Sequence, residues 1–162
     1  MNPNDLFIYA ARYDNEDDAQ GDLETFQRIA SVGLVGKYDT AILIKNAEGK
    51  VRVEKHGTQA KSGGWKGAIA GGVVGLLFPP SILVGALAGG AAGAVAGKLW
   101  GGMSRKDLNA LGEVLDDGET GLVIVGESAV DEFVEKALTR AAKRIRKVAK
   151  ARLADLDREL SE

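Results

Sequence analysis

A long apolar segment near the middle of the chain carries no charged side chain between residues 67 and 97. Glycine recurs at every fourth position on both sides of Pro79 and Pro80. The members of these two rows are Gly63, Gly67, Gly71, Gly75, Gly85, Gly89, Gly93 and Gly97. Small residues four apart suit helices whose backbones approach closely, and the two rows are symmetric about Pro80. The pattern predicts that residues 59–103 form an inserted glycine-zipper helical hairpin, with the two rows as the helix-packing interface.

Bulky apolar side chains gather at the bend of this hairpin, whereas its base is mostly glycine and alanine. The expected membrane tip consists of Leu76, Leu77, Phe78, Ile82 and Leu83. Trp65 and Trp100 close the base, and lysines and an arginine lie just outside them. An apolar tip, an aromatic collar and a cationic rim are typical of a segment that enters a bilayer from the cytoplasmic side. We therefore expect Trp65 and Trp100 to form a membrane collar.

The length of the arms bears on how the hairpin would meet a membrane. A full crossing needs about 20 apolar residues, and the first arm, residues 65–78, is shorter. A re-entrant or marginal hairpin is therefore expected in preference to two complete spans. Hydropathy alone does not separate lipid-facing helices from buried ones. The alternative that the hairpins bury one another inside a soluble homo-oligomer stays open.

The segments on either side of the insert alternate between strand and helix patterns. Apolar runs predict strands at residues 6–11, 38–44 and 121–126, and alternation with charged residues predicts a further strand at residues 50–55. Helical spacing follows Asp14, an expected N-cap, and also follows Ser104, another expected N-cap. The order is β-α-β-β, hairpin, α-β. It predicts an α+β fold with a ferredoxin-like βαββαβ sheet, built from residues 1–58 and 104–127.

Residues 128–162 are predicted to form a long C-terminal amphipathic basic helix. Its apolar residues keep four-three spacing with one slip, which is compatible with a coiled coil and so with a homo-oligomer. Eight lysines and arginines lie between residues 136 and 152, with no acid among them. The candidates for contact with anionic lipid are Lys143, Arg144, Arg146, Lys147 and Lys150. The simpler interpretation of these cations is a solvated helix face.

Composition changes this picture mainly by exclusion. The net charge of −2 gives no general attraction to nucleic acid, and the first 13 residues lack the pattern of a secretory signal. The absence of cysteine excludes disulfides, thiol catalysis and Cys-type zinc sites. His56 is the single histidine, and the acidic run at residues 14–18 lacks the glycine and glutamate of an EF-hand. Residues 93–98 (GAVAGK) lack the Ser or Thr of a phosphate loop. We predict no enzyme, cofactor, metal site or small-molecule substrate.

Four stretches together resemble a known family. They are YAARYDNEDDA, KSGGWKGAIAGGVVGLLFPPS, GGAAGAVAGKL and DDGETGLVIVGE. The pattern, from residue 6 to residue 148, is similar to bacterial proteins of the domain of unknown function 1269 family. The resemblance implies membrane association and a stress-linked role, but it supplies no catalytic residue. Where the family often has Pro-Gly-Ser before the last strand, this chain has Asp117, Gly118 and Glu119.

The function predicted from these patterns is that of a non-enzymatic, self-associating membrane protein. Its hairpin would enter the inner membrane while the αβ domain stays in the cytoplasm. The expected partners are membrane lipid and further copies of the chain. The alternatives are a soluble homo-oligomer with the hairpins in its interior, or a pore formed by several hairpins. A small-ligand sensor in the αβ domain is suggested by fold analogy alone.

Overall fold

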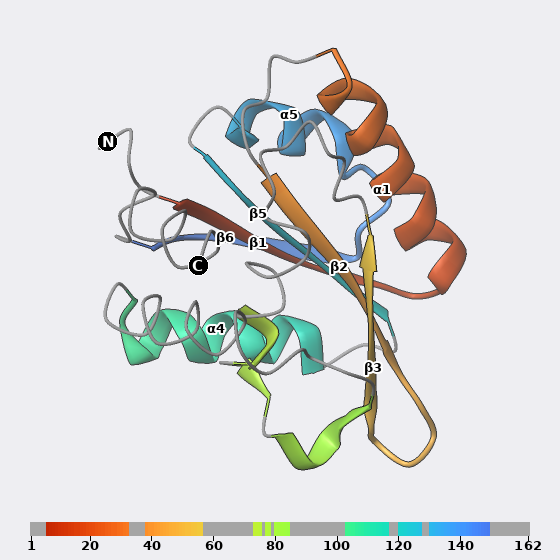
Figure 1. Cartoon of the computed structure of the whole chain (residues 1–162), viewed down its shortest axis with the longest axis vertical. Coiled ribbons are helices and arrows are strands. Elements are labelled where there is room, and N and C mark those ends of the chain that lie inside the picture. Colours follow the sequence, from red (N-terminus) through yellow and green to blue (C-terminus); the bar gives the residue numbers. More distant parts are fainter. Residues whose placement is uncertain are drawn as a thin grey trace, which may run out of the picture.

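The computed structural model describes residues 6–32, 38–56, 73–75, 77–78, 80–84, 103–116, 120–127 and 130–149. These residues form an α+β fold around a six-stranded sheet (Figure 1). Its elements are β1 (Leu6–Tyr13), α1 (Glu16–Ala30), β2 (Tyr38–Lys45), β3 (Val51–His56), the 3-10 helix η2 (Pro80–Ile82), β4 (Leu83–Val84), α4 (Arg105–Asp116), β5 (Thr120–Gly126), α5 (Val130–Ala137) and β6 (Lys143–Ala149).

The strands lie in the order β4-β3-β2-β5-β1-β6. Neighbouring strands are antiparallel, except that β4 runs parallel to β3. Consequently β5 lies between β1 and β2, and β1 lies between β5 and β6. The units β1-α1-β2 and β5-α5-β6 are therefore interlocked, each enclosing a strand of the other.

The sequence predicted a ferredoxin-like sheet from strands at residues 6–11, 38–44, 50–55 and 121–126 without fixing their order. In the structure the strands from the last two segments take different positions: β5 lies in the centre and β3 lies outside β2. Side-chain polarity explains the difference: every residue of β5 is buried, whereas Arg52 of β3 is exposed. A strand that is apolar on both sides suits the middle of a sheet covered on both faces.

The sheet carries helices on both faces (Figure 1). We call the side of α1 and α5 the first face and the side of α4 the second face. Successive side chains of a strand point to opposite faces. Accordingly, Phe7 and Tyr9 belong to the core cluster of the first face, and Leu6 and Ile8 to that of the second. Both clusters are buried, so the domain has two apolar layers with the sheet between them.

Local capping sets the helix starts. Asn15, rather than the predicted Asp14, is the N-cap of α1, because its side-chain oxygen accepts a hydrogen bond from the Asp18 backbone N–H at 2.8 Å. Three acidic residues then occupy the first turn, where the helix dipole favours them. The predicted cap of α4 is confirmed, since the Ser104 hydroxyl accepts from the Asp107 N–H at 3.1 Å.

The long C-terminal helix predicted for residues 128–162 is wrong within the described residues. Helix α5 ends at Ala137, and residues 143–149 form β6, which pairs with β1 along its whole length. The three-residue spacing of Ile145 and Val148 suits a helix, but pairing with β1 overrides this local preference. In the sheet β6 satisfies the outward-facing peptide groups of β1, which a helix would leave to other partners.

Candidate functional site

The candidate site lies on the second face, where part of the insert packs against the sheet beside α4 (Figure 1). We call residues 73–75, 77–78 and 80–84 the tip segment. Val73 and Val74 are fully buried and Phe78 is 6% exposed. The remaining bulky members, Leu77, Ile82 and Leu83, are partly buried against the same cluster. The tip segment therefore supplies part of the core of the second face.

The tip segment changes conformation along its length. Residues 73–75 are helical, and the Phe78 N–H donates to the Val74 carbonyl at 3.1 Å. The 3-10 helix η2 follows, and β4 then pairs with the start of β3, with Leu83 beside Val51 and Val84 beside Arg52. The prediction that a helical arm already runs through residues 83–84 is wrong. The pairing with β3 holds these two residues in an extended conformation.

Helix α4 forms the other side of the site. A Cβ atom built on Gly112 would lie 4.0 Å from the Leu77 carbonyl oxygen, so the two backbones come close at this position. Ion pairs hold α4 at both ends: Lys147 Nζ lies 3.3 Å from Asp107, and Lys45 Nζ lies 2.8 Å from Asp116. Lys45 also donates to the Asp116 carbonyl at 2.9 Å, which caps the end of the helix. Both lysines come from the sheet, so α4 is tied across it.

The energetics of this site are those of apolar burial. Fully burying a Val, Leu or Phe side chain stabilises a fold by roughly 1.5–3 kcal/mol relative to leaving it in water. No residue of the tip segment carries a charge, so its side chains form no ion pairs. The site therefore holds an apolar segment, and the tip segment brings no acid, base or nucleophile to it other than the Ser81 hydroxyl.

A cavity of about 450 Å³ lies between α4 and the ends of β1 and β6. Arg12 and Lys143, which are cross-strand partners, line it from the sheet, and Glu113 and Asp116 line it from α4. Charges of both signs thus border the cavity, and Asp116 already has a partner in Lys45. This mixture selects neither an anionic nor a cationic ligand. Within the described ranges, no group of three or more His, Asp or Glu residues is placed to hold a metal ion.

One family model, described as a protein of unknown function (DUF1269), matches residues 64–161. The chain belongs to the DUF1269 family. The match begins before the tip segment and includes α4, β5, α5 and β6, so it covers the insert side of the site. Searches of curated proteins and of solved structures find no match.

The structure describes four of the five predicted tip residues of this DUF1269 protein. Leu77, Phe78, Ile82 and Leu83 come together on the second face. Leu76, the collar residues Trp65 and Trp100, and seven of the eight row glycines lie outside the described residues. Gly75 is exposed, and a Cβ built on it would meet no described atom within 4 Å. None of the helices in the described part of the chain combines the length and the hydropathy needed to cross a membrane.

Four of the five cations predicted to contact lipid lie on the edge strand β6 of the DUF1269 fold and not on a helix. Arg144 donates to the Glu135 carboxylate at 2.6 Å and to the Leu138 carbonyl at 2.9 Å. Arg146 lies over the Phe7 ring at 5.2 Å, and Lys147 pairs with Asp107. Protein groups thus engage Arg144, Arg146 and Lys147, Lys143 lines the cavity, and Lys150 lies outside the described residues. Charges on an edge strand also discourage pairing with other chains.

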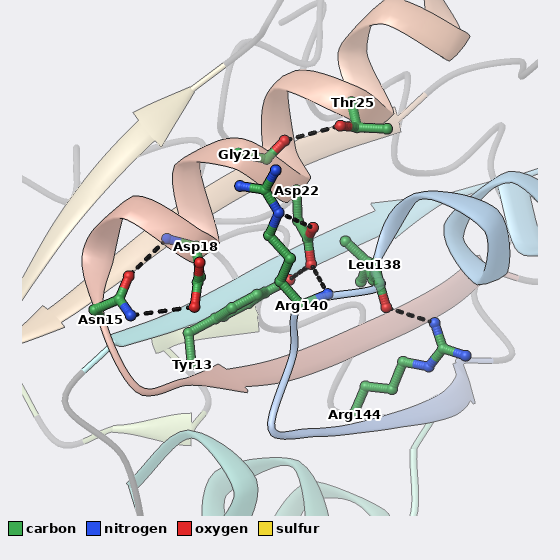
Figure 2. Close-up of polar contacts among 9 residues, drawn as sticks. All are labelled: Tyr13, Asn15, Asp18, Gly21, Asp22, Thr25, Leu138, Arg140 and Arg144. Atoms are coloured by element: carbon green, nitrogen blue, oxygen red, sulfur yellow. Dashed lines mark hydrogen bonds and ion pairs between the residues drawn. The ribbon is translucent and has the colours of Figure 1, made fainter.

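Sequence reasoning missed a buried polar network on the first face (Figure 2). The Asp22 carboxylate is 1% exposed; it accepts from the Tyr13 hydroxyl at 2.8 Å and from the Arg140 backbone N–H at 3.0 Å. Burial, reinforced by the Asp22 carboxylate, raises the pKa of Tyr13 far above its ordinary value. An acid between Ala19 and Phe26 on the apolar side of α1 was the available signal. The network joins α1, β1 and the segment before β6, so its role is structural.

Proposed function

We propose that this DUF1269 protein is a non-enzymatic membrane protein whose glycine-rich insert enters a lipid bilayer. The observation that supports the proposal is the shelter from water that the tip segment receives. Val73, Val74 and Phe78 are packed into an apolar layer, within a run of 31 residues that carries no charge. A bilayer offers the same side chains a second water-free environment. In this proposal the αβ domain carries the insert to the bilayer.

Self-association is the second part of the proposal. Small residues at every fourth position let helices of one copy, or of several copies, pack closely in lipid. We also infer that β2, β5, β1 and β6, with α1 and α5, form a ferredoxin-like core. In this assignment β3, the insert and α4 are added between the second and third strands of the core, which makes the insert an elaboration of a common scaffold.

Vesicle flotation combined with tryptophan fluorescence tests the membrane proposal. Trp65 and Trp100 are the two tryptophans of the chain, so intrinsic emission reports on the predicted collar directly. The expected result is that the protein floats with phosphatidylcholine–phosphatidylglycerol vesicles and that brominated lipid quenches its emission. Trp65→Phe and Trp100→Phe variants assign the signal to each side of the collar.

Protein that stays at the bottom of the gradient, with unchanged emission, would reject membrane association. A defined particle in lipid-free buffer that Gly71→Leu or Gly89→Leu breaks would then favour the soluble homo-oligomer. Flux of small solutes across the vesicles would identify a pore, which the uncharged insert does not favour.

A further inference from the structure

The tip segment and α4 are attached to the second face in different ways. Helix α4 is tied by ion pairs at both ends, through Lys147 to Asp107 and through Lys45 to Asp116. The uncharged side chains of the tip segment take part in no such pair, and within the described residues β4 contributes two residues of strand at the margin of the sheet. The tip segment is therefore attached to this face mainly by apolar contacts, whereas α4 has ion pairs in addition.

We propose that the contact between the tip segment and the second face is an autoinhibitory contact. In this proposal the tip segment is stored against the sheet and α4 until the protein meets a bilayer, where it undocks as a unit and lipid replaces its protein surroundings. The inference rests on the proposed membrane function and adds its regulation. The stored state is the one in which Val73, Val74 and Phe78 are buried.

The physical argument is a balance between two apolar environments. Leaving the second face costs the tip side chains little if they pass into hydrocarbon, because neither environment contains water. The cost that remains is exposure of the part of the apolar cluster that the tip segment covers, a cluster to which Leu43, Val51 and Leu111 also belong. In this proposal a bilayer binds the released tip segment better than the docked one and so shifts the equilibrium towards release. In water without lipid the tip segment stays docked.

Gly112 is the position where this balance can be altered with least other disturbance. A Cβ at Gly112 would lie 4.0 Å from the Leu77 carbonyl oxygen, which is an ordinary van der Waals contact. Gly112→Ala therefore fits beside the docked tip segment, whereas the longer side chain of Gly112→Leu pushes against it. Both substitutions improve the helix propensity of α4, so their difference isolates the effect on docking.

An engineered disulfide can hold the tip segment in place. Val51 and Leu83 are register partners on β3 and β4, and adjacent strands lie about 4.8 Å apart, within the Cα separation that a disulfide spans. The chain has no native cysteine, so Val51→Cys with Leu83→Cys forms a single defined pair. Flotation with phosphatidylcholine–phosphatidylglycerol vesicles is measured for the wild type and for the oxidised and reduced forms of this double variant.

The expected result is an apparent affinity of the oxidised form for vesicles at least about tenfold weaker than that of the reduced form, because the binding-competent fraction is removed. Gly112→Leu should bind vesicles more tightly than Gly112→Ala, which should match the wild type. Equal binding of the oxidised and reduced forms overturns the storage proposal and leaves the membrane function intact. Equal binding of Gly112→Leu and Gly112→Ala overturns it as well, even if the cysteine variant does not fold. Absence of vesicle binding by the wild type rejects the membrane function, and the storage proposal with it.

Discussion

On the first face of the sheet, a buried hydrogen-bond network joins α1 to β1 and to the segment between α5 and β6, whereas on the second face α4 shares the cover with an uncharged tip segment. The Asp22 carboxylate ties α1 to β1 through Tyr13 and to the segment before β6 through Arg140. The tip segment is also buried, with Val73 and Val74 fully covered, but it carries no charged side chain. Both faces thus have buried elements, but the first face adds hydrogen bonds to a buried carboxylate, whereas the side chains of the tip segment make apolar contacts.

This difference teaches that burial alone does not make a segment a permanent part of a fold. Apolar contact is non-directional, so another water-free environment can replace it. Hydrogen bonds to a buried carboxylate are directional, and breaking them leaves polar groups without partners, which is costly. The first face should therefore behave as one cooperative unit, and the second face should open locally at the tip segment.

The largest expected effect comes from truncating a phenylalanine on each face. Phe26 is fully buried and packs edge-to-face on Tyr38, so Phe26→Ala should lower the free energy of unfolding by about 3–5 kcal/mol. Phe78→Ala should lower it by about half as much or less, because the tip segment can detach before the domain unfolds. Urea denaturation followed by circular dichroism measures both values.

Limited proteolysis under native conditions sharpens the same comparison. Phe78→Ala should speed cleavage within the insert, and Phe26→Ala should speed cleavage only in proportion to global unfolding. Equal losses of stability in the two variants, with no selective cleavage of the insert, would mean that the two faces are equally integral to the domain.

An intermediate effect is expected at alkaline pH and concerns the first face. Burial raises the pKa of Tyr13 and of Tyr38 above the ordinary value near 10. The Tyr13 side chain stays neutral in the folded protein when the unfolded chain begins to lose its tyrosine protons. The folded state then binds more protons, so Tyr13 should reduce stability by about 1.4 kcal/mol per pH unit above pH 10, and this loss is absent below it. The raised pKa of Tyr38 acts in the same direction.

Urea unfolding of the wild type and of Tyr13→Phe, from about pH 9 to about pH 11, measures this contribution. All ionisable groups other than Tyr13 are common to the two proteins, so their contributions cancel in the difference. The wild type should lose stability more steeply than Tyr13→Phe. Parallel curves would show that Tyr13 ionises as readily in the folded protein as in the unfolded chain.

The smallest effect is expected at Gly21, in the middle of α1. A Cβ there would overlap the guanidinium of Arg140, whose side chain is 56% exposed and lies 4.0 Å from Asp22. Gly21→Ala should gain about 1 kcal/mol of helix propensity and lose part of it by displacing Arg140. In an Arg140→Ala background the same substitution should show the full gain. Thermal unfolding of the wild type, the two single variants and the double variant measures the gain in both backgrounds. An identical gain in the two backgrounds would contradict the prediction.

Local patterns were enough to predict much of the fold. The capping of α4 by Ser104, the strands at residues 6–11, 38–44, 50–55 and 121–126, and the burial of residues 121–126 follow from side chains close together in the chain. These features depend on alternation of apolar and polar residues and on hydrogen bonds that span three residues. The concentration of Leu77, Phe78, Ile82 and Leu83 beside the prolines predicted a membrane tip, which stays a prediction. In the structure these residues come together on the second face, where Phe78 is buried and the other three are partly buried.

Features that depend on distant partners were not readable in this way. Residues 143–149 have an ambiguous period, and β1 made them a strand by offering an unpaired edge. In the sequence Asp22 is an ordinary helix residue. Its partners Tyr13 and Arg140 lie 9 and 118 positions away along the chain, and only the fold brings them to it. The hydrophobicity of the tip segment predicts that it avoids water. It does not predict whether protein or lipid covers the segment, because the free energy of transferring apolar side chains out of water is nearly the same for both. Only the packing of the tip segment against the second face shows that the protein itself covers these apolar side chains.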